Sequence, residues 1–374
     1  MTEREYRAIG RLSYSSVKQF LDNRWEYYEK HELKIKKLEE QTYDMAFGTL
    51  VETRLWTEQA FGELFVEAQT DKPGGQMGEL VEKLYTYTTK CLTPEGIVTR
   101  DFTDLLTDAF NAVAFDSKGV KVKFKKKTIE DIILAFTGSE YEKYYREMLE
   151  NTGKYLVGQA DIKLADNCKN YLAKHWRTGD IVTRKTNGRY TVYHQLVILY
   201  EYLGVEFKSK LDMVSIDDEL KLIEIFDLKI TFDVELFNFS YRKFKYYLQA
   251  YLYYIAIKRW AQENGLGHYK IAPMKFIVGH SRAEIAPLVF KIRQGNMINA
   301  RDGFNFDGKR YTGVNEAVEA IKWHRQTNIW DMSKKNFENK GDCNIKIYED
   351  EQMETNKHNV VSGSYSGTRH HASN

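Results

Sequence analysis

Two aspartates and a lysine interrupt a stretch that otherwise reads as buried β-structure. Asp212 ends an alternating run, and Asp227 and Lys229 lie within the β-prone residues 220–230. Burying unpaired charges costs several kcal/mol, so charged groups at such positions indicate a site more than a core. Residues 206–231 are therefore the first place to look for chemistry.

The same stretch has the pattern of a β-hairpin. Two turn-forming aspartates separate the alternating run from the β-branched one. A turn centred near Glu219 and Leu220 sets Asp212 opposite Asp227, because paired strands run back from the turn in register. The two-residue period of a strand also places Asp227 and Lys229 on one face. The hairpin thus brings two carboxylates and an ammonium together.

This combination of charges predicts a metal site. Like charges directly opposite on a ladder destabilise it, and a hard divalent cation is the natural compensation. Carboxylate and carbonyl oxygens suit magnesium, while a lysine supplies a compact positive charge. Phosphodiester hydrolysis uses this set, because the cation and the ammonium both stabilise charge on a phosphoryl oxygen.

The spacing Asp212 … Asp227-Leu228-Lys229 resembles the D…(D/E)xK core of the PD-(D/E)XK nuclease superfamily. The surrounding letters, LDMV…IEIFDLKIT, resemble the RecB and phage RecE-type exonuclease branch. The resemblance extends over most of the chain. One departure is Ile230, which stands where relatives commonly carry threonine.

An upstream helix carries a second match. Residues 46–52, AFGTLVE, resemble the "a-x-G-t-l-v-H/E" helix of this branch, whose last residue is a metal ligand. The resemblance therefore implies that Glu52 binds metal. Gly48 lies one helical turn before Glu52, so we expect a close approach of the backbone beside the carboxylate.

A downstream helix, predicted at residues 241–263, carries a third match. Gln249 and Tyr253 fit the Q-x-x-x-Y signature of the branch, and their i,i+4 spacing places them on one helix face. The resemblance implies that this helix lies against the active site and helps to hold DNA. Arg242 and Lys245 fall in its first turns, where they either contact phosphate or are solvated; cations there oppose the macrodipole unless an anion binds.

Taken together, the resemblance implies a metal-dependent DNA nuclease, most simply a phage-type exonuclease acting in recombination, repair or replication. Its expected cofactor is Mg²⁺ or Mn²⁺, and its expected partners are DNA and a phage single-strand annealing or recombination protein. Lys229 would orient the attacking water or stabilise charge in the transition state. The expected metal ligands are Glu52, Asp212, Asp227 and the carbonyl of Leu228.

The remaining patterns predict the elements that position these residues. The fold class expected is α/β, a restriction-endonuclease-like α-β-β-β-α-β core whose mixed central sheet is flanked by helices. Helices are predicted at 13–29, 79–90, 101–115, 128–150, 161–175 and 313–325, and further strands at 189–200, 274–279 and 287–292.

The domain organisation follows from the changes in pattern. Residues 1–340 are predicted to form one nuclease domain, which contains a helical insertion at about 62–153. Residues 341–374 are polar and poor in apolar groups, so a disordered tail is expected there.

Composition limits the class of protein. The 374 residues are 43% hydrophobic and 14% aromatic, which supports a packed core. A net charge of +2 leaves any attraction for nucleic acid to local patches. Three widely separated cysteines argue against a disulfide framework and against a four-cysteine iron–sulfur cluster. No long apolar run and no signal-peptide core are seen, so we expect a cytoplasmic protein without a membrane anchor; oligomeric state stays open.

Two other interpretations compete with a nuclease. The chain could be a non-catalytic DNA-binding or assembly protein on a nuclease-like fold, although a decayed site should have lost at least one of its acids or the lysine. It could also be an unrelated α/β protein with an accidental D…DLK, but then the matches at Glu52 and at Gln249 would be coincidences too.

Overall fold

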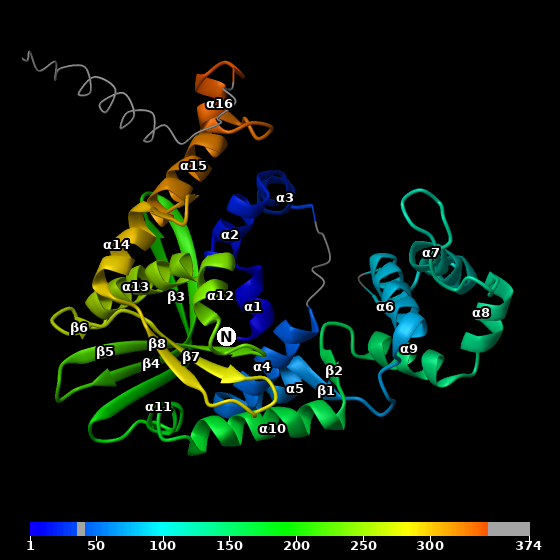
Figure 1. The fold of residues 1–374 in the computed structure, drawn as a ribbon, viewed down its shortest axis with the longest axis horizontal. Helices are drawn as coiled ribbons and strands as arrows, with labels where there is room; N and C mark the ends of the chain where they lie inside the picture. The colour runs from blue at the N-terminus through cyan, green and yellow to red at the C-terminus, as the bar shows by residue number, and fades with distance from the viewer. Residues whose placement is uncertain (36–41, 94, 343–374) are drawn as a thin grey trace, which may run out of the picture. The chain divides into compact units, whose positions relative to one another are not determined.

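The computed structural model describes residues 1–35, 42–93 and 95–342. Its centre is a six-stranded mixed sheet in the order β3-β4-β5-β7-β8, with β6 paired to β5 (Figure 1). Of the predicted tail at 341–374, residues 343–374 lie outside the described part of the chain. The strands of the sheet are β3 (Tyr190–Tyr202), β4 (Val205–Asp217), β5 (Leu222–Thr231), β6 (Lys270–Ile271), β7 (Lys275–His280) and β8 (Leu288–Lys291).

The predicted hairpin is formed by β4 and β5, in the register expected. Their antiparallel ladder runs from the pair Asp217 and Leu222 to the pair Met213 and Phe226. β5 then pairs in parallel with β7, which requires a crossover connection, and the helices between the two strands supply it. This mixed sheet with flanking helices is the α/β architecture predicted from the sequence.

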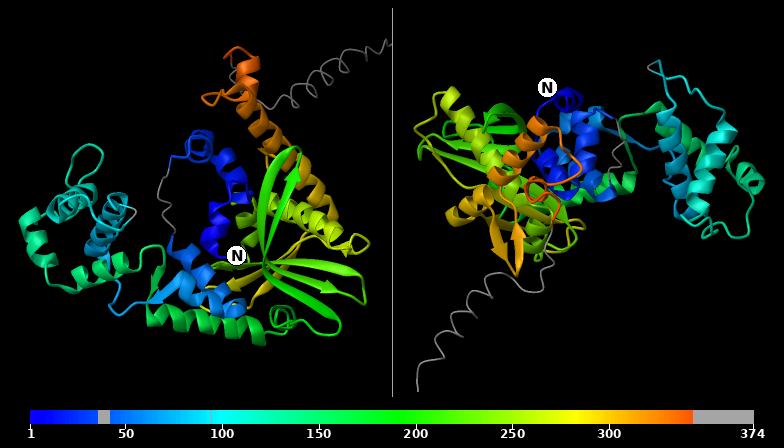
Figure 2. Two further views of the ribbon diagram at one scale, coloured as in Figure 1. Left: turned by 180° about the vertical axis from the view of Figure 1, so that it is seen from behind. Right: turned by 90° about the horizontal axis from the view of Figure 1, so that it is seen from above.

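Helices cover both faces of the sheet (Figures 1 and 2). On one face α4 (Tyr43–Trp56) and α10 (Gln159–Lys174) bury an apolar core with β4, β5 and β7. On the other face lies α13 (Tyr246–Glu263), whose Trp260 contacts Tyr193 of β3 edge-on at 5.4 Å. The central residues of β5 are therefore shielded on both sides, which explains their long apolar run.

The remaining elements precede the sheet or follow it. Before it come α1 (Glu3–Ala8), α2 (Tyr14–Asp22), α3 (Arg24–Tyr27), a π-helix (Tyr28–Glu32), a 3₁₀ turn (Glu58–Ala60), α5 (Phe61–Leu64), β1 (Phe65–Glu67), α6 (Gly75–Lys90), α7 (Phe102–Ala114), α8 (Ile129–Phe136), α9 (Glu140–Glu150), β2 (Tyr155–Val157) and α11 (Gly179–Val182). After β5 come α12 (Phe237–Lys243), α14 (Gln294–Asp302), β9 (Phe304–Phe306), β10 (Lys309–Tyr311), α15 (Val314–Thr327) and α16 (Lys334–Glu338).

The segment predicted as a helical insertion has a core of its own. Helices α6 to α9 pack around a cluster that includes Leu84, Leu106 and Phe136, each with no exposed surface. The segment is entered through β1 and left through β2, and these two short strands pair in parallel. The sequence predicts one domain over residues 1–340 that contains this insertion, and this division stays a prediction.

Three predicted helices are broken where local backbone geometry forbids continuation. The helix expected at 241–263 is two helices, because Lys245 adopts a left-handed conformation (φ 56°) between α12 and α13. Gly138 (φ 72°) separates α8 from α9. Asn23 ends α2 and caps α3 through its side chain, so the helix expected at 13–29 is also interrupted.

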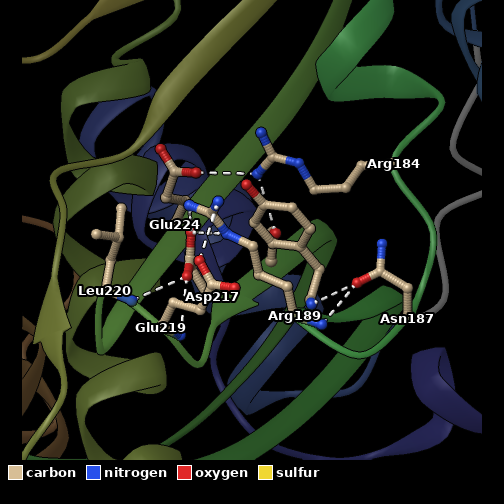
Figure 3. A network of polar contacts seen from close by, with 9 residues as sticks. Arg184, Asn187, Arg189, Asp217, Glu219, Leu220 and Glu224 are labelled. Atoms are coloured by element: carbon tan, nitrogen blue, oxygen red, sulfur yellow. Dashed lines mark hydrogen bonds and ion pairs between the residues drawn. The ribbon is translucent and has the colours of Figure 1, made fainter.

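A polar network joins the strands at the hairpin's turn end (Figure 3). Arg184 donates to Glu224 at 3.0 Å. Lys275 forms an ion pair with the same carboxylate. Arg189 donates to Asp217 beside the turn at 2.7 Å. Burial would raise the pKa of Glu224, but the hydrogen bonds from Lys275 and Arg184 hold it below its usual value. The network ties β3, β4, β5 and β7 together.

The described chain divides into two compact units, Met1–Ile321 and a second that begins at Lys322. The sheet and all the predicted site residues belong to the first unit. Among the described helices, none combines the length and the apolar character needed to cross a membrane.

Candidate active site

The site lies where β4 and β5 separate. Their ladder stops at Met213 and Phe226, one residue before the two predicted acids would pair. Here the Asp212 side chain replaces a strand contact, because its Oδ2 accepts the backbone N–H of Leu228 at 3.0 Å. Further along, the exposed edge of β4 pairs instead with Leu12. The separation leaves room for side chains between two strands that are hydrogen-bonded elsewhere.

Asp227 and Lys229 lie side by side within this opening. Asp227 has no exposed surface; its Oδ1 accepts the Gln249 side-chain amide at 2.6 Å, and its Oδ2 is in ion-pair contact with Lys229. Apart from this ion pair, no described group bonds to Oδ2, so Oδ2 keeps an unused acceptor position. Lys229 keeps 22% of its side chain exposed and rests over the ring of Tyr246, at 4.9 Å from the centroid. The lysine is thus both paired and accessible to a ligand.

Glu52 enters the site from α4, held by Gln195. The Gln195 side-chain amide donates to Glu52 Oε1, although the two residues are 143 positions apart. Gln195 lies within β3 but has a left-handed backbone (φ 52°), which is costly for a residue with a side chain. Strain of this kind persists only where the surroundings fix it, and it clusters at functional sites.

The left-handed backbone at Gln195 also changes which face of the sheet the side chains of β3 occupy. Residues of the same parity lie on opposite faces before and after Gln195. His194, just before it, stacks on Trp56 of α4 at 5.3 Å. Tyr200 would share that face in a regular strand, yet its hydroxyl donates to the Leu252 carbonyl of α13. Gln195 lies opposite Asp212. It is the one residue between Tyr190 and Tyr202 that has no partner in the β3–β4 ladder. It therefore directs polar groups of both strands into the opening.

The electrostatics of the three acids show that they share one environment. Burial raises the pKa of Glu52 to about 7; Lys210 opposes this rise and Asp227 adds to it. Burial, then Glu52 and Asp227, raise the pKa of Asp212 well above its usual value. Burial also raises the pKa of Asp227, against the effect of Lys229. Burial opposes the charge of Lys229, but Asp227 and Asp212 raise its pKa above the usual value.

These residues fit a hard divalent cation in ligand type and in charge. If all three carboxylates were ionised by a bound cation, they and the one ammonium would together carry a formal charge of −2, and Asp227 Oδ2 is a buried acceptor without a hydrogen bond. Within the described part of the chain, however, no three His, Cys, Asp or Glu side chains are gathered closely enough to form a ready metal cage. Each acid is instead held by its own donor: Gln195, the Leu228 amide, or Gln249 with Lys229.

The predicted substrate-binding residues fall into two groups. Gln249 is buried against Asp227, and the Tyr253 hydroxyl donates to the Lys210 carbonyl at 2.8 Å, so both face the site from α13. Lys245 instead forms an ion pair with Asp22, and Arg242 lies 4.1 Å from the ring centroid of Phe306. Both cations are engaged by the protein's own groups.

Two expectations about this region were wrong. Arg242 does not begin a helix but lies in the last turn of α12, where a cation suits the macrodipole. An added Cβ at Gly48 would meet no described atom within 4 Å, so the close approach expected there does not involve a described part of the chain. The error at Gly48 arose because spacing on a helix does not reveal what faces it.

Neither Gln195 nor Lys210 is among the site residues that the sequence predicts. The signal for Gln195 is weak: it is one amide in a run of β-branched and aromatic residues, RYTVYHQLVILY. Only the tertiary fold, by bringing β3 against α4, shows that it contacts Glu52.

No family model matches the chain, and no curated protein matches it. Among solved structures, a candidate exonuclease from Eubacterium rectale is similar with a TM-score of 0.42 and 13% sequence identity, over 80% of each chain.

Proposed function

We propose that the protein is a metal-dependent nuclease that hydrolyses phosphodiester bonds in DNA. The observation that carries this proposal is the opening between β4 and β5, where Asp227 contacts Lys229 and the charges of Glu52 and Asp212 act on the same surroundings. A surplus of buried negative charge, beside an accessible ammonium, suits a reaction in which a cation and a lysine act together on a phosphate.

The ligands proposed for Mg²⁺ or Mn²⁺ are Glu52, Asp212, Asp227 and the Leu228 carbonyl. When bound, the cation would supply Lewis-acid stabilisation of charge on a phosphoryl oxygen. Lys229 would orient the attacking water and stabilise the developing negative charge. Its contact with Asp227 fits this role, since the carboxylate holds the ammonium in place until substrate arrives.

The chain's other residues would position these groups and the strand. Gln249 fixes Asp227, and Tyr253 anchors the β4 backbone next to Asp212. We propose that Arg242 and Lys245 contact phosphates of the substrate strand. To bind a phosphate, Lys245 would have to leave its ion pair with Asp22. Digestion from ends, a phage origin and a recombination partner such as an annealing protein are further parts of the proposal that come from the family resemblance.

The decisive experiment compares end-labelled linear duplex with closed circular DNA, in magnesium, in manganese and in EDTA. We expect metal-dependent loss of the linear DNA alone. Lys229→Ala should lower the cleavage rate by at least about 100-fold while the protein stays folded, because one donor to the transition state is lost. Exposed Lys270, at the far end of the sheet, provides the matched control variant, and its change to alanine should leave cleavage intact.

Each other result has a definite meaning. Cutting of the circle would assign an endonuclease. Cleavage that survives Lys229→Ala would refute the assigned role of Lys229. Metal-independent binding of DNA without cleavage of either substrate would favour the competing interpretation, a non-catalytic DNA-binding protein on this fold.

A further inference from the structure

The N-terminal helix α1 lies on two lysines of β4, Lys208 and Lys210, which stand four and two residues before Asp212. Lys208 Nζ donates to the carbonyls of Tyr6 and Ile9, each at 2.8 Å, and Lys210 forms an ion pair with Glu3. The Tyr6 ring covers both ammonium groups, at 4.7 Å and 5.5 Å from its centroid. The N-terminus lies beside the sheet in all three views (Figures 1 and 2).

Polar contacts rather than apolar burial hold α1 in this place. The helix has six residues, none of them buried, and a Thr2 capping box begins it. Glu3 and Lys210 keep 25% and 28% of their side chains exposed. Burial would raise the pKa of Glu3, but Lys210 and Arg7 lower it, so the carboxylate is charged at neutral pH. The pair is only partly buried, so water still screens it, and a competing anion can displace Glu3.

Lys210 is close enough to the acids to act on whatever enters the site. It stands two residues before Asp212, and its carbonyl is fixed by the Tyr253 hydroxyl. Among the groups acting on Glu52, its charge is the strongest opponent of the burial effect. A nucleic-acid strand with one phosphate at the acids carries further phosphates on either side, and lysines at such sites position the backbone without reading sequence.

We propose that Lys210 is a phosphate-binding residue for the substrate strand, and that Glu3 of α1 occupies it until DNA displaces the helix. This rests on the proposed nuclease function and deepens it, since it makes α1 an internal competitor of the substrate. The alternative is a fixed ion pair that only anchors the N-terminus.

The test measures DNA affinity in EDTA, where cleavage is blocked, by fluorescence anisotropy of a labelled oligonucleotide over a range of salt. Glu3→Gln should tighten binding several-fold. Lys210→Gln should weaken it and lower the slope of log affinity against log salt by about 0.7–0.9, the value for one phosphate contact. In the Lys210→Gln background, Glu3→Gln should have no effect, because its target is gone.

Glu5→Gln is the matched control, since it removes the same charge from the same helix while glutamine preserves the capping box. It should leave the affinity unchanged. Hydrogen exchange of residues 3–8 should also become faster when DNA is bound.

The inference is overturned if Glu3→Gln leaves the affinity unchanged, if Glu5→Gln tightens binding equally, or if the gain persists without Lys210. In those cases a native protein that still cleaves DNA through Lys229 leaves the nuclease proposal standing. If neither the native protein nor any variant binds or cleaves DNA, the proposed function itself fails.

Discussion

At the scale of single residues, the site depends on a few side chains that are held in costly states. Gln195 has a left-handed backbone within a strand, and Asp227 is a carboxylate with no exposed surface. Neither state favours stability by itself. Gln195 fixes an oxygen of Glu52 and Asp227 supplies oxygens of its own, and a cation bound as proposed would offset both costs.

The role of Gln195 predicts a separation between stability and activity. Gln195→Ala removes the hydrogen bond to Glu52, and we expect the metal concentration for half-maximal cleavage to rise by about 10-fold or more. Gln195→Gly should show the same defect, yet be more stable than the alanine variant by about 1 kcal/mol, because glycine accepts a positive φ. The half-maximal metal concentration is measured by titrating cleavage with metal, and the stability of each variant is measured by urea unfolding. Equal stability of both variants would argue that the strain is absent.

The buried acids also predict how the metal-free protein responds to pH. The pKa of Glu52 is raised from an ordinary 4.5 to about 7, so the folded state holds the proton more tightly than the unfolded state. Its unfavourable contribution grows as pH rises from about 4.5 to about 7, and the melting temperature should fall over this range. In Glu52→Gln the fall should be smaller.

Magnesium provides the complementary measurement. A cation bound to the folded state alone adds stability by mass action, about 2.7 kcal/mol at 100 times its Kd. We expect the gain in melting temperature to be larger at about pH 8 than at about pH 6, because protons compete for the same oxygens. No shift with magnesium at either pH, in a protein that cleaves DNA, would show that the acids bind the cation only with substrate.

At the scale of elements, the two ends of the β4–β5 hairpin differ: one is fixed by a polar network, and at the other the strands separate. The turn end is tied by Arg184, Lys275 and Glu224, while the other end opens at Asp212. A hairpin that is fixed at one end can hold the separation at the other without fraying. Stability and chemistry are therefore separated along the same two strands.

This division predicts a variant that is less stable but still active. Glu224→Gln leaves two cations without their carboxylate in a setting where only 15% of the Glu224 side chain is exposed, and should cost about 2 kcal/mol of unfolding free energy. The rate of cleavage at moderate temperature should not change. Because the pKa of Glu224 is lowered on folding, its contribution is present above about pH 4.5 and lost as pH falls below it.

The control for this prediction is Glu219→Gln, at the exposed turn, which should have little effect on stability. A loss of activity in Glu224→Gln that exceeds its loss of folded protein would show that the network also positions the site.

At the scale of the whole molecule, the segment between α4 and the central sheet is built as a separate packing unit. Its apolar cluster shares no buried residue with the core beneath the sheet. The parallel pair Phe65–Glu67 and Tyr155–Val157 brings its two ends together. A segment with joined ends and its own core can be removed without leaving a large unpaired surface.

We therefore predict that replacing residues 69–153 by a short Gly/Ser linker yields a folded protein with Lys229-dependent cleavage. The isolated segment should be helical by circular dichroism and should unfold cooperatively. Deletion of residues 69–153 should weaken DNA binding without slowing the chemical step, so the KM for DNA would rise while kcat stays the same. An insoluble deletion variant beside a folded isolated segment would show that the sheet depends on the insertion.

Much of this architecture could be predicted from the sequence because its signals are local. The hairpin register follows from strand alternation and a turn, and the predicted helix starts near Ser13 and Thr128 are confirmed, because these side chains cap α2 and α8. The acids and Lys229 are visible because they break an apolar pattern. The break at Lys245 was missed because its left-handed conformation leaves no mark on helical periodicity.

The sequence by itself determined the α/β class, the hairpin and the candidate acids. Only the tertiary structure decided that β4 and β5 separate at Asp212, that Gln195 holds Glu52, and that Glu3 covers Lys210. Periodicity and turn chemistry act between neighbours along the chain, whereas these contacts join residues far apart in it. Such contacts depend on which edges and faces the packed sheet leaves open, and no local pattern records that.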